Sequence, residues 1–427
     1  MNIARTILND LALRISEVGR GLISAPQKSS LTTLCDGLLS GQGEATGLAT
    51  ACVIFDRYAE LPNDKKQAFF LALKDQFGVD RDRFTKALEA WQAGDGRGMR
   101  HLHTASEPRS QELIRRLNRA PGGTRRLVGM RQDLLAFMAE DRSLQVLDDD
   151  FRHLFSSWFN RGFLELRRID WSTPAAILEK IIKYEAVHEI TGWDDLRRRV
   201  AAPDRRLYAF FHPALADDPL IFVEVALSEG IPGNIGAILA ADRAMLDPVK
   251  AQTAVFYSIS NCQEGLRGVS FGNFLIKQVV EELRREFAGL TNFVTLSPVP
   301  GLRRWATAQL AAGTLPDRFA KALQTTDTAP DTPPDGLAEL TAHYMLVARA
   351  KNGGAADPVA RFHLGNGARL EKIHVNADAS PRGQAASWGV MVNYLYDLAT
   401  IERNHEAYTT TGEIIAAPAV HKLLKSS

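Results

Sequence analysis

A serine stands at the end of a predicted strand in the stretch TLSPVPGLRRW, residues 295–305. The apolar run NFVTL leads into Ser297, and two prolines and a glycine follow within four residues. Because proline restricts the backbone, this turn would present the Ser297 hydroxyl rigidly, as a reacting group requires. A serine before a proline is also common as a turn or cap residue, and the local sequence alone favours that interpretation.

A glycine-containing turn between a predicted strand and a predicted helix is the second candidate site. The strand at 253–261 is followed by LRGVSFGNFLI and by the amphipathic helix 271–287. The free N–H groups and the positive dipole end at the start of a helix suit a pyrophosphate, and glycine allows the backbone to turn sharply. The residues of this candidate anion site are Arg267, Gly268, Val269, Ser270, Phe271, Gly272 and Asn273. The spacing matches neither G-x-G-x-x-G nor a Walker loop, so an ordinary connection with structural glycines is the alternative.

The elements that must position these residues differ between the two parts of the chain. Residues 1–158 are predicted to form helix after helix, beginning with an amphipathic segment for which a transit peptide is the alternative. From residue 159, β-branched and aromatic runs bounded by Pro, Asp and Gly predict strands at 205–213, 219–228, 253–261 and 292–297. We therefore expect an all-helical domain over 1–158 and an α/β domain over 159–427. The stretch TTDTAPDTPPDG, residues 325–336, is typical of a surface loop.

The bulk composition excludes several classes of protein. The 427 residues are too many for one ordinary core, and 45% hydrophobic with 24% charged residues is typical of a soluble globular protein. A formal net charge of +1 argues against a polyanionic partner, and the basic run at 100–119 is expected to be a solvated helical face, with nucleic-acid binding as the weaker alternative. No apolar run approaches the ~20 residues of a membrane span. Three unpatterned cysteines indicate reduced thiols and a cytoplasmic protein.

Four motifs in a fixed order resemble the malonyl-CoA decarboxylase family. They are SISNCQEGLRGVSFGNFLIK (258–277), TLSPVPGLRRW (295–305), RFHLGNGARLEKI (361–373) and NADASPRGQAASWGVMVNYLY (376–396). The resemblance begins upstream, through EAVHEITGWDDLRRRV, and covers about residues 165–410. Within it, the 267–273 turn is similar to the acetyl-CoA loop of GCN5-related acyltransferases, with Ser270 in place of the usual middle glycine. The family implies a helical domain followed by a GCN5-related N-acetyltransferase-like mixed α/β domain.

The resemblance also implies an activity and site residues. The implied reaction converts malonyl-CoA to acetyl-CoA and CO2, with Ser297, His363 and Tyr396 at the positions of the family's catalytic serine, histidine and tyrosine. Ser270 occupies the place of a family glutamate, so a mechanism that needs a carboxylate there is in doubt. The family further suggests a homotetramer assembled through the helical domain. No nucleic-acid or membrane partner is expected.

The chemistry of this reaction fits these residue types. Decarboxylation leaves an enolate, which needs hydrogen-bond donors at its oxygen, an oriented carboxylate and a proton. The thioester is its own electron sink, so we expect no metal, biotin or other cofactor; His101 and His103 form a pair that nothing completes as a metal site. His363 is the natural proton donor, because histidine has an ordinary pKa near neutrality. Ser297 is either a base or a hydrogen-bond donor, and Tyr396 orients one of the other two groups.

Other interpretations of the same residues stay open at this point. His363 can be a strand histidine with a satisfied ring, Tyr396 can be a core residue, and His405 is a spare candidate. The alternative functions are an acetyl-CoA-dependent N-acyltransferase, a serine thioesterase with Ser297 as nucleophile, and a non-enzymatic adaptor. Ser297, the nucleophile of the thioesterase alternative, does not lie in the G-x-S-x-G elbow of many serine hydrolases, which argues against the thioesterase.

Overall fold

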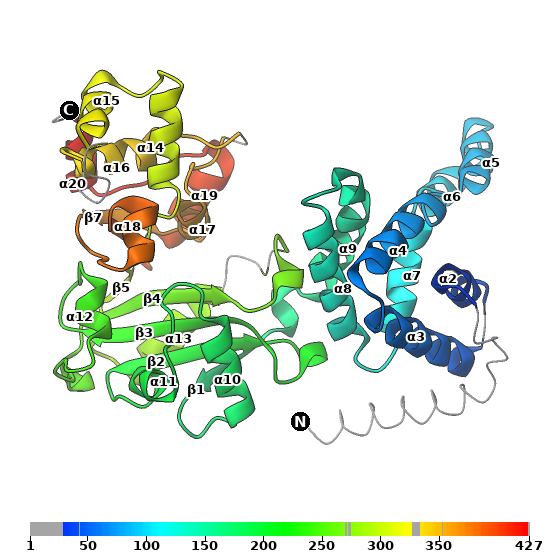
Figure 1. Cartoon of the computed structure of the whole chain (residues 1–427), viewed down its shortest axis with the longest axis horizontal. Coiled ribbons are helices and arrows are strands. Elements are labelled where there is room, and N and C mark those ends of the chain that lie inside the picture. Colours follow the sequence, from blue (N-terminus) through cyan, green and yellow to red (C-terminus); the bar gives the residue numbers. More distant parts are fainter. Residues whose placement is uncertain are drawn as a thin grey trace. The chain divides into compact units, whose positions relative to one another are not determined.

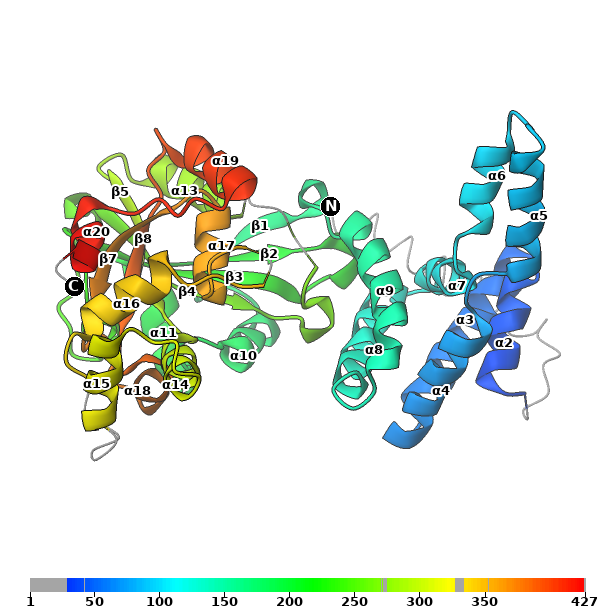
Figure 2. The same cartoon turned by 90° about the horizontal axis from the view of Figure 1, so that it is seen from above.

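The computed structural model describes residues 29–41, 43–269, 271, 275–326, 334–351 and 353–425. The chain forms two compact units (Figures 1 and 2). The helical unit comprises the chain up to Leu164 together with His212–Asp217 and Gln263–Phe271. The sheet unit comprises Glu165–Phe211, Asp218–Cys262 and the chain from Gly272 onwards. The amphipathic segment predicted as the first helix lies outside the described residues.

The helical unit confirms the prediction of successive helices. Every regular element described between residue 29 and Leu164 is an α-helix or a short 3-10 turn. The α-helices are α2 (Leu31–Leu39), α3 (Glu44–Ala59), α4 (Asn63–Gln76), α5 (Arg81–Gln92), α6 (Gly98–Ala105), α7 (Arg109–Asn118), α8 (Gly123–Phe137) and α9 (Gln145–Trp158). The 3-10 turn η5 (Glu264–Leu266), which comes from between two elements of the sheet unit, packs against α8 within this helical unit.

A close backbone approach fixes this turn on α8. A Cβ atom added at Gly265 would lie 1.9 Å from the carbonyl oxygen of Val128. The buried guanidinium of Arg131 pairs with Asp148 (2.8 Å) and also donates to the carbonyl oxygens of Gly265 (2.7 Å) and Arg267 (2.9 Å). The start of the predicted anion loop is therefore anchored to α8 and α9.

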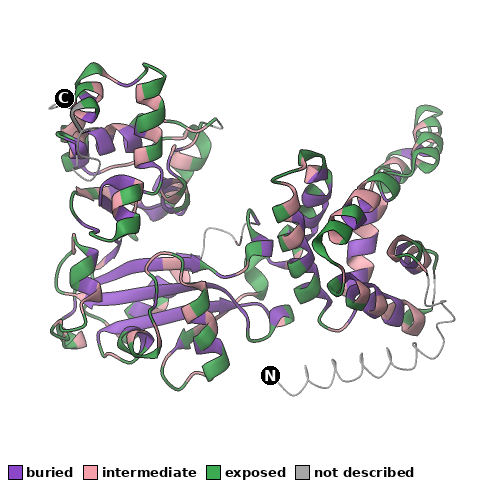
Figure 3. Ribbon diagram, viewed as in Figure 1, coloured by how far each residue is buried: buried purple, intermediate pink, exposed green. Residues whose placement is uncertain are grey.

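The sheet unit is built on an eight-stranded mixed sheet. Its strands are β1 (Glu165–Ile169), β2 (Arg205–Phe211), β3 (Pro219–Ser228), β4 (Thr253–Asn261), β5 (Asn292–Thr295), β6 (Ser297–Pro298), β7 (Arg369–His374) and β8 (Met391–Leu395). The order is β1-β2-β3-β4-β5-β8-β6, with β7 paired to β8, and only the pairing of β4 with β5 is parallel. Strands β2 to β4 are buried almost throughout (Figure 3), which explains why they appear in the sequence as continuous apolar runs.

Helices cover both faces of the strands. The described helices of this unit are α10 (Ala175–Tyr184), α11 (Trp193–Val200), α12 (Ile235–Leu239), α13 (Leu275–Glu286), α14 (Leu302–Ala311), α15 (Asp317–Thr326), α16 (Leu337–Leu346), α17 (Pro358–Gly365), α18 (Pro381–Ser387), α19 (Ile401–Thr411) and α20 (Pro418–Lys425). In Figure 2, α10 and α11 lie on one side of β1–β3 and α13 lies on the other. Ile181 and Leu196 of α10 and α11 pack in one core with Leu207 and Phe222 of the sheet. None of the described helices combines the length and the apolar character of a membrane span.

The sheet opens between β4 and β5. Their parallel ladder ends at the pair Phe256–Thr295, and the last bond runs from the Leu296 N–H to the Phe256 carbonyl. Ser297 then pairs with Val392 of β8 instead. In the β3–β4 ladder the register shifts at the same level, which leaves Tyr257 as the extra residue of a β-bulge. The opening produced by these two departures is the place of the candidate site.

Candidate active site

The structure brings Ser297, His363 and Tyr396 together. Ser297 Oγ lies 3.2 Å from Nε2 of His363, and the Tyr396 hydroxyl lies 2.8 Å from Nδ1 of the same ring. The three side chains come from β6, from α17 and from the residue that follows β8. They are separated by 66 and 33 positions in the sequence, so only the fold makes them neighbours.

Each of the three elements has an identifiable anchor. Tyr396 is held by its backbone N–H, which donates to the Phe293 carbonyl of β5 (2.8 Å). Helix α17 begins after Asp357, whose Oδ1 accepts the N–H groups of Val359 (2.9 Å) and Ala360 (3.0 Å) as an N-cap. His363 is therefore a helical residue, and the interpretation of it as a strand residue is wrong.

The cap of α17 also reaches the turn after Ser297. Oδ2 of Asp357 accepts the Gly301 N–H (3.3 Å) and the Tyr344 hydroxyl (3.4 Å). A Cβ atom at position 301 would lie 2.3 Å from the Tyr344 hydroxyl, so a larger residue there would displace the Tyr344 side chain. One carboxylate thus fixes the turn that carries Ser297 against the helix that carries His363.

Burial sets the charge state of the site. Ser297, His363 and Tyr396 are 5%, 3% and 1% exposed. Burial lowers the pKa of His363 to about 3, so its imidazole is uncharged near neutral pH, in contrast to the near-neutral pKa expected from the sequence. The Tyr394 ring stacks on it at 4.6 Å, and burial raises the pKa of Tyr396 well above its ordinary value, so the phenol stays protonated.

A pocket of about 250 Å³ opens onto Ser297 and His363. Its lining is Val187, Ile221, Phe256, Tyr257, Ile259, Asn261, Ser297, Pro298, Pro358, Val359, Phe362 and His363. These residues come from both sides of the opening between β4 and β5. With His363 neutral, no residue of this described lining carries a charge, so the pocket is apolar except for one amide, two hydroxyls and one imidazole.

A partly buried carboxylate that sequence reasoning missed, Glu185, holds one wall of this pocket. Glu185 accepts the N–H groups of Val187 (2.8 Å) and His188 (2.7 Å) and the hydroxyl of Ser258 on β4 (2.8 Å). It thereby ties the segment that contains Val187 to the strand beside it. The only signal in the sequence was its place at the start of the motif EAVHEITGW.

The predicted anion loop is described only in part. Arg267, Gly268, Val269 and Phe271 belong to the helical unit, whereas Ser270, Gly272 and Asn273 lie outside the described residues. Gly268 has a φ of 77°, which favours glycine. Ser297, His363 and Tyr396 belong to the sheet unit. Phosphate binding by this loop stays a prediction.

The remaining histidine candidates have other surroundings. The Nδ1–H of His405 donates to the Gly365 carbonyl at the end of α17 (2.7 Å), so His405 stabilises the helix that carries His363. His101 is mostly exposed and lies 3.8 Å from Asp95. Within the described part of the chain no group of three His, Cys, Asp or Glu residues is arranged to hold a metal ion.

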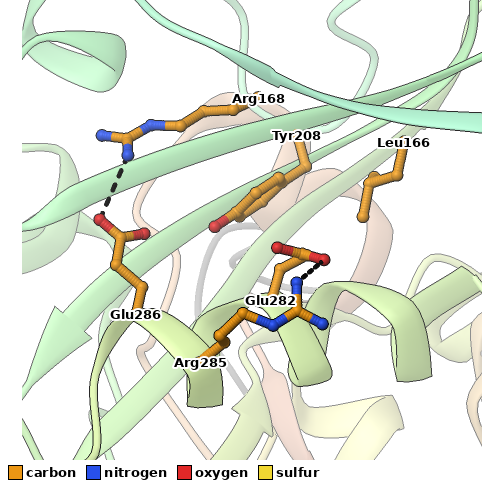
Figure 4. Close-up of a pocket in the computed structure, with 6 residues that line it drawn as sticks. All are labelled: Leu166, Arg168, Tyr208, Glu282, Arg285 and Glu286. Carbon is orange, nitrogen blue, oxygen red and sulfur yellow. Dashed lines mark hydrogen bonds and ion pairs between the residues drawn. The ribbon is translucent and has the colours of Figure 1, made fainter.

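A second pocket of about 300 Å³ lies between β1, β2 and α13 (Figure 4). Its charged residues pair with one another, Arg168 with Glu286 (3.2 Å) and Arg285 with Glu282 (2.7 Å). None of the candidate site residues lines this pocket. Each charged side chain in its described lining is already paired, so the pocket has no free charge with which to bind a ligand.

Comparison with known proteins adds independent information. Family models described as the malonyl-CoA decarboxylase C-terminal and N-terminal domains match residues 162–427 and 77–159. The chain is 36% identical to "Malonyl-CoA decarboxylase, mitochondrial" of Anser anser anser over 347 residues, which cover 73% of this chain and 69% of that protein. The corresponding protein of Rattus norvegicus is 34% identical over 368 residues, 76% and 72% of the two chains.

Solved structures extend the similarity over nearly the whole chain. The malonyl-CoA decarboxylase of Rhodopseudomonas palustris is 51% identical with a TM-score of 0.87, covering 92% of this chain and 98% of that one. The enzyme of Agrobacterium vitis gives the same identity and TM-score over 93% and 100%. The expected fold, a helical region followed by a mixed sheet domain, is confirmed.

Proposed function

The chain belongs to the malonyl-CoA decarboxylase family and is a carboxy-lyase, and we propose that it converts malonyl-CoA to acetyl-CoA and CO2 at the Ser297–His363–Tyr396 cluster. The observation that carries this assignment is the buried chain of hydrogen bonds Ser297–His363–Tyr396 at the wall of an uncharged pocket. In this proposal Ser297 and His363 act on the malonyl group, and Tyr396 orients the imidazole.

The uncharged pocket favours loss of CO2. A malonyl carboxylate that enters it leaves water and meets no cation among the described lining residues. In the transition state the charge spreads from the carboxylate toward the thioester oxygen and C2, where it is less concentrated. An apolar site with a few fixed dipoles therefore stabilises the transition state more than the bound carboxylate.

Donors for the enolate oxygen are available at two places. The His363 imidazole faces the pocket, and the β-bulge at Tyr257 interrupts the ladder beside it. A bulge leaves the extra residue's backbone unpaired, so its N–H can bind a developing oxyanion. Both donor sets are held by the sheet, which limits reorganisation during the reaction.

The proton donor depends on the substrate in this mechanism. The His363 imidazole is neutral when buried among aromatic rings. The negative charge of a malonyl group or of the enolate next to it raises its pKa, since an opposite charge favours the protonated form. His363 can then protonate C2, while the Tyr396 hydroxyl holds the ring in place.

The CoA moiety is assigned to the loop 267–273 and to the start of the helix after it. The support is the glycine at position 268 and the anchoring of this loop by Arg131. Independence from a metal or other cofactor, assembly as a homotetramer, a cytoplasmic location and the lack of nucleic-acid or membrane partners stay predictions.

Labelled malonyl-CoA distinguishes the proposed reaction from its alternatives. The decarboxylase releases labelled CO2 and acetyl-CoA without an acceptor, an N-acyltransferase needs an added amine, and a thioesterase releases the free CoA thiol. We expect Ser297→Ala and His363→Asn to reduce CO2 release by about 10²- to 10⁴-fold. The matched control His101→Asn changes an exposed histidine of the helical unit and should retain wild-type activity. Unchanged CO2 release in both site variants would refute the assignment.

A further inference from the structure

Thr295, the last residue of β5, contacts the candidate cluster from the side of the sheet. It is completely buried, and its Oγ1 accepts the Ser297 hydroxyl hydrogen (2.9 Å) and the backbone N–H of Tyr394 on β8 (3.1 Å). Its carbonyl accepts the Asn393 side-chain amide (2.7 Å). Strands β5 and β8 together therefore fix the position of this hydroxyl oxygen.

The direction of the Ser297–Thr295 hydrogen bond determines the others in the cluster. A hydroxyl has one hydrogen, and Ser297 gives it to Thr295, so toward His363 the Ser297 oxygen can only accept. Nε2 of His363 must then carry a hydrogen. In a neutral imidazole Nδ1 is left as an acceptor, and the Tyr396 O–H donates to it.

We propose that Thr295 is a positioning residue that takes the hydroxyl hydrogen of Ser297 and thereby holds His363 in the tautomer with its hydrogen on Nε2. This tautomer directs an N–H toward Ser297 and the pocket, where negative charge develops in the proposed reaction. The opposite tautomer directs a lone pair there and repels an enolate. The effect on turnover rests on the proposed function, whereas the tautomer does not.

The tautomer can be measured directly in the whole protein labelled with ¹⁵N-histidine. The His363 signals are assigned by their loss in His363→Asn. We expect a protonated Nε2 and an unprotonated Nδ1 in the wild type and in Thr295→Ser, which keeps the hydroxyl. In Thr295→Val the Ser297 hydroxyl is released and Nδ1 becomes protonated in a substantial fraction of molecules. A wild type with its hydrogen on Nδ1 overturns the proposal, whether or not any variant folds.

Kinetics then tests whether the tautomer matters. We expect Thr295→Val to lower kcat by about 10- to 100-fold with KM for malonyl-CoA within about twofold, and Thr295→Ser to stay near wild type. Valine also removes the acceptor of the Tyr394 N–H, so the unfolding of each variant is measured alongside. A changed tautomer with wild-type kcat overturns the positioning role. If the wild type shows the expected tautomer but releases no CO2, the proposed function fails and the tautomer assignment stands.

Discussion

At the scale of single residues, the central feature is an uncharged histidine in a buried site. Sequence reasoning assigned His363 as proton donor because of its ordinary pKa, but the fold surrounds its ring with Phe362, Tyr394 and Tyr396. Burial disfavours the imidazolium, and both ring nitrogens are hydrogen-bonded to neutral hydroxyls. In the proposed reaction, the imidazolium therefore forms only when the negatively charged malonyl group is next to it.

The lowered pKa of His363 predicts a pH-dependent stability. The imidazole has a pKa of about 3 in the folded protein, against an ordinary value of 6.5. Between these values the unfolded chain binds more protons, so the free energy of unfolding falls as the pH falls through this window and loses nothing more below about pH 3. Between pH 7 and pH 5, protonation of His363 in the unfolded chain alone should lower the free energy of unfolding by roughly 2 kcal/mol.

Urea unfolding of wild type and His363→Gln at both pH values checks this prediction. The variant lacks the titrating group, so its free energy of unfolding should fall less than that of the wild type, by roughly 2 kcal/mol. Equal losses in the two proteins would contradict the depressed pKa.

At the scale of elements, the site depends on two secondary structures that Asp357 fixes together. One carboxylate oxygen caps α17, and the other binds the Gly301 N–H in the turn after Ser297. This side chain thus links the turn after Ser297 to the helix that carries His363. Tyr344 contributes a second donor to the same oxygen.

The substitution Asp357→Asn separates the capping of α17 from the hydrogen bond to the Gly301 N–H. The asparagine oxygen can still cap α17, but its amide group cannot accept the Gly301 N–H. We expect a loss of stability of about 1 kcal/mol and a loss of kcat of about tenfold, because the two catalytic candidates are no longer held at one distance. Unfolding and steady-state assays measure both. Asp80→Asn, which changes the N-cap of α5, is the matched control and should leave kcat unchanged. An Asp357→Asn protein with wild-type kcat would exclude the positioning effect.

At the scale of the whole molecule, the two compact units are not two consecutive pieces of sequence. The chain leaves the sheet after Cys262, contributes Gln263–Phe271 to the helical unit and returns to the sheet unit from Gly272. Arg131 of α8 bonds two carbonyl groups of this excursion and also neutralises the buried Asp148. The loop assigned to CoA thus depends on the helical unit for its conformation.

The substitution Arg131→Met tests whether the conformation of the loop 267–273 depends on α8. It leaves the Asp148 carboxylate buried without its cation, which costs about 3–5 kcal/mol. It also frees the Gly265 and Arg267 carbonyls, so we expect KM for malonyl-CoA to rise by about tenfold or more, with a smaller change in kcat. Thermal unfolding and steady-state kinetics measure these effects. The control Arg115→Met removes the partly exposed ion pairs of Arg115 with Glu107 and Glu112 and should change neither parameter appreciably. An unchanged KM in a folded Arg131→Met protein would count against the assigned loop.

The sequence predicts correctly the secondary structures that depend on the local pattern of apolar and polar residues. The predicted strands at 205–213, 219–228 and 253–261 are β2, β3 and β4. The predicted amphipathic helix 271–287 is α13 over its described residues, with one face buried. Ser297, the last residue of the predicted strand at 292–297, instead begins the separate short strand β6. Its pairing with β8, about 95 positions later, has no local signal.

The supporting residues were missed for the same physical reason. Thr295 lies within the motif that was singled out, but its role appears only when Tyr394 is beside it. Asp357 precedes a proline, a usual start of a helix, yet nothing nearby indicates that it also binds Gly301. The lowered pKa of His363 likewise comes from burial, which spacing in the sequence does not measure.

The close packing of Gly265 against α8 limits where the chain can be truncated without loss of structure. A catalytic fragment that starts at residue 165 would keep the Gln263–Phe271 excursion but lose the helix on which it rests. The fragment's Gly265 and Arg267 carbonyls would have no Arg131, and Val128 would no longer pack at the glycine. A truncation that removes α8 therefore also removes the support of the loop to which we assign CoA binding.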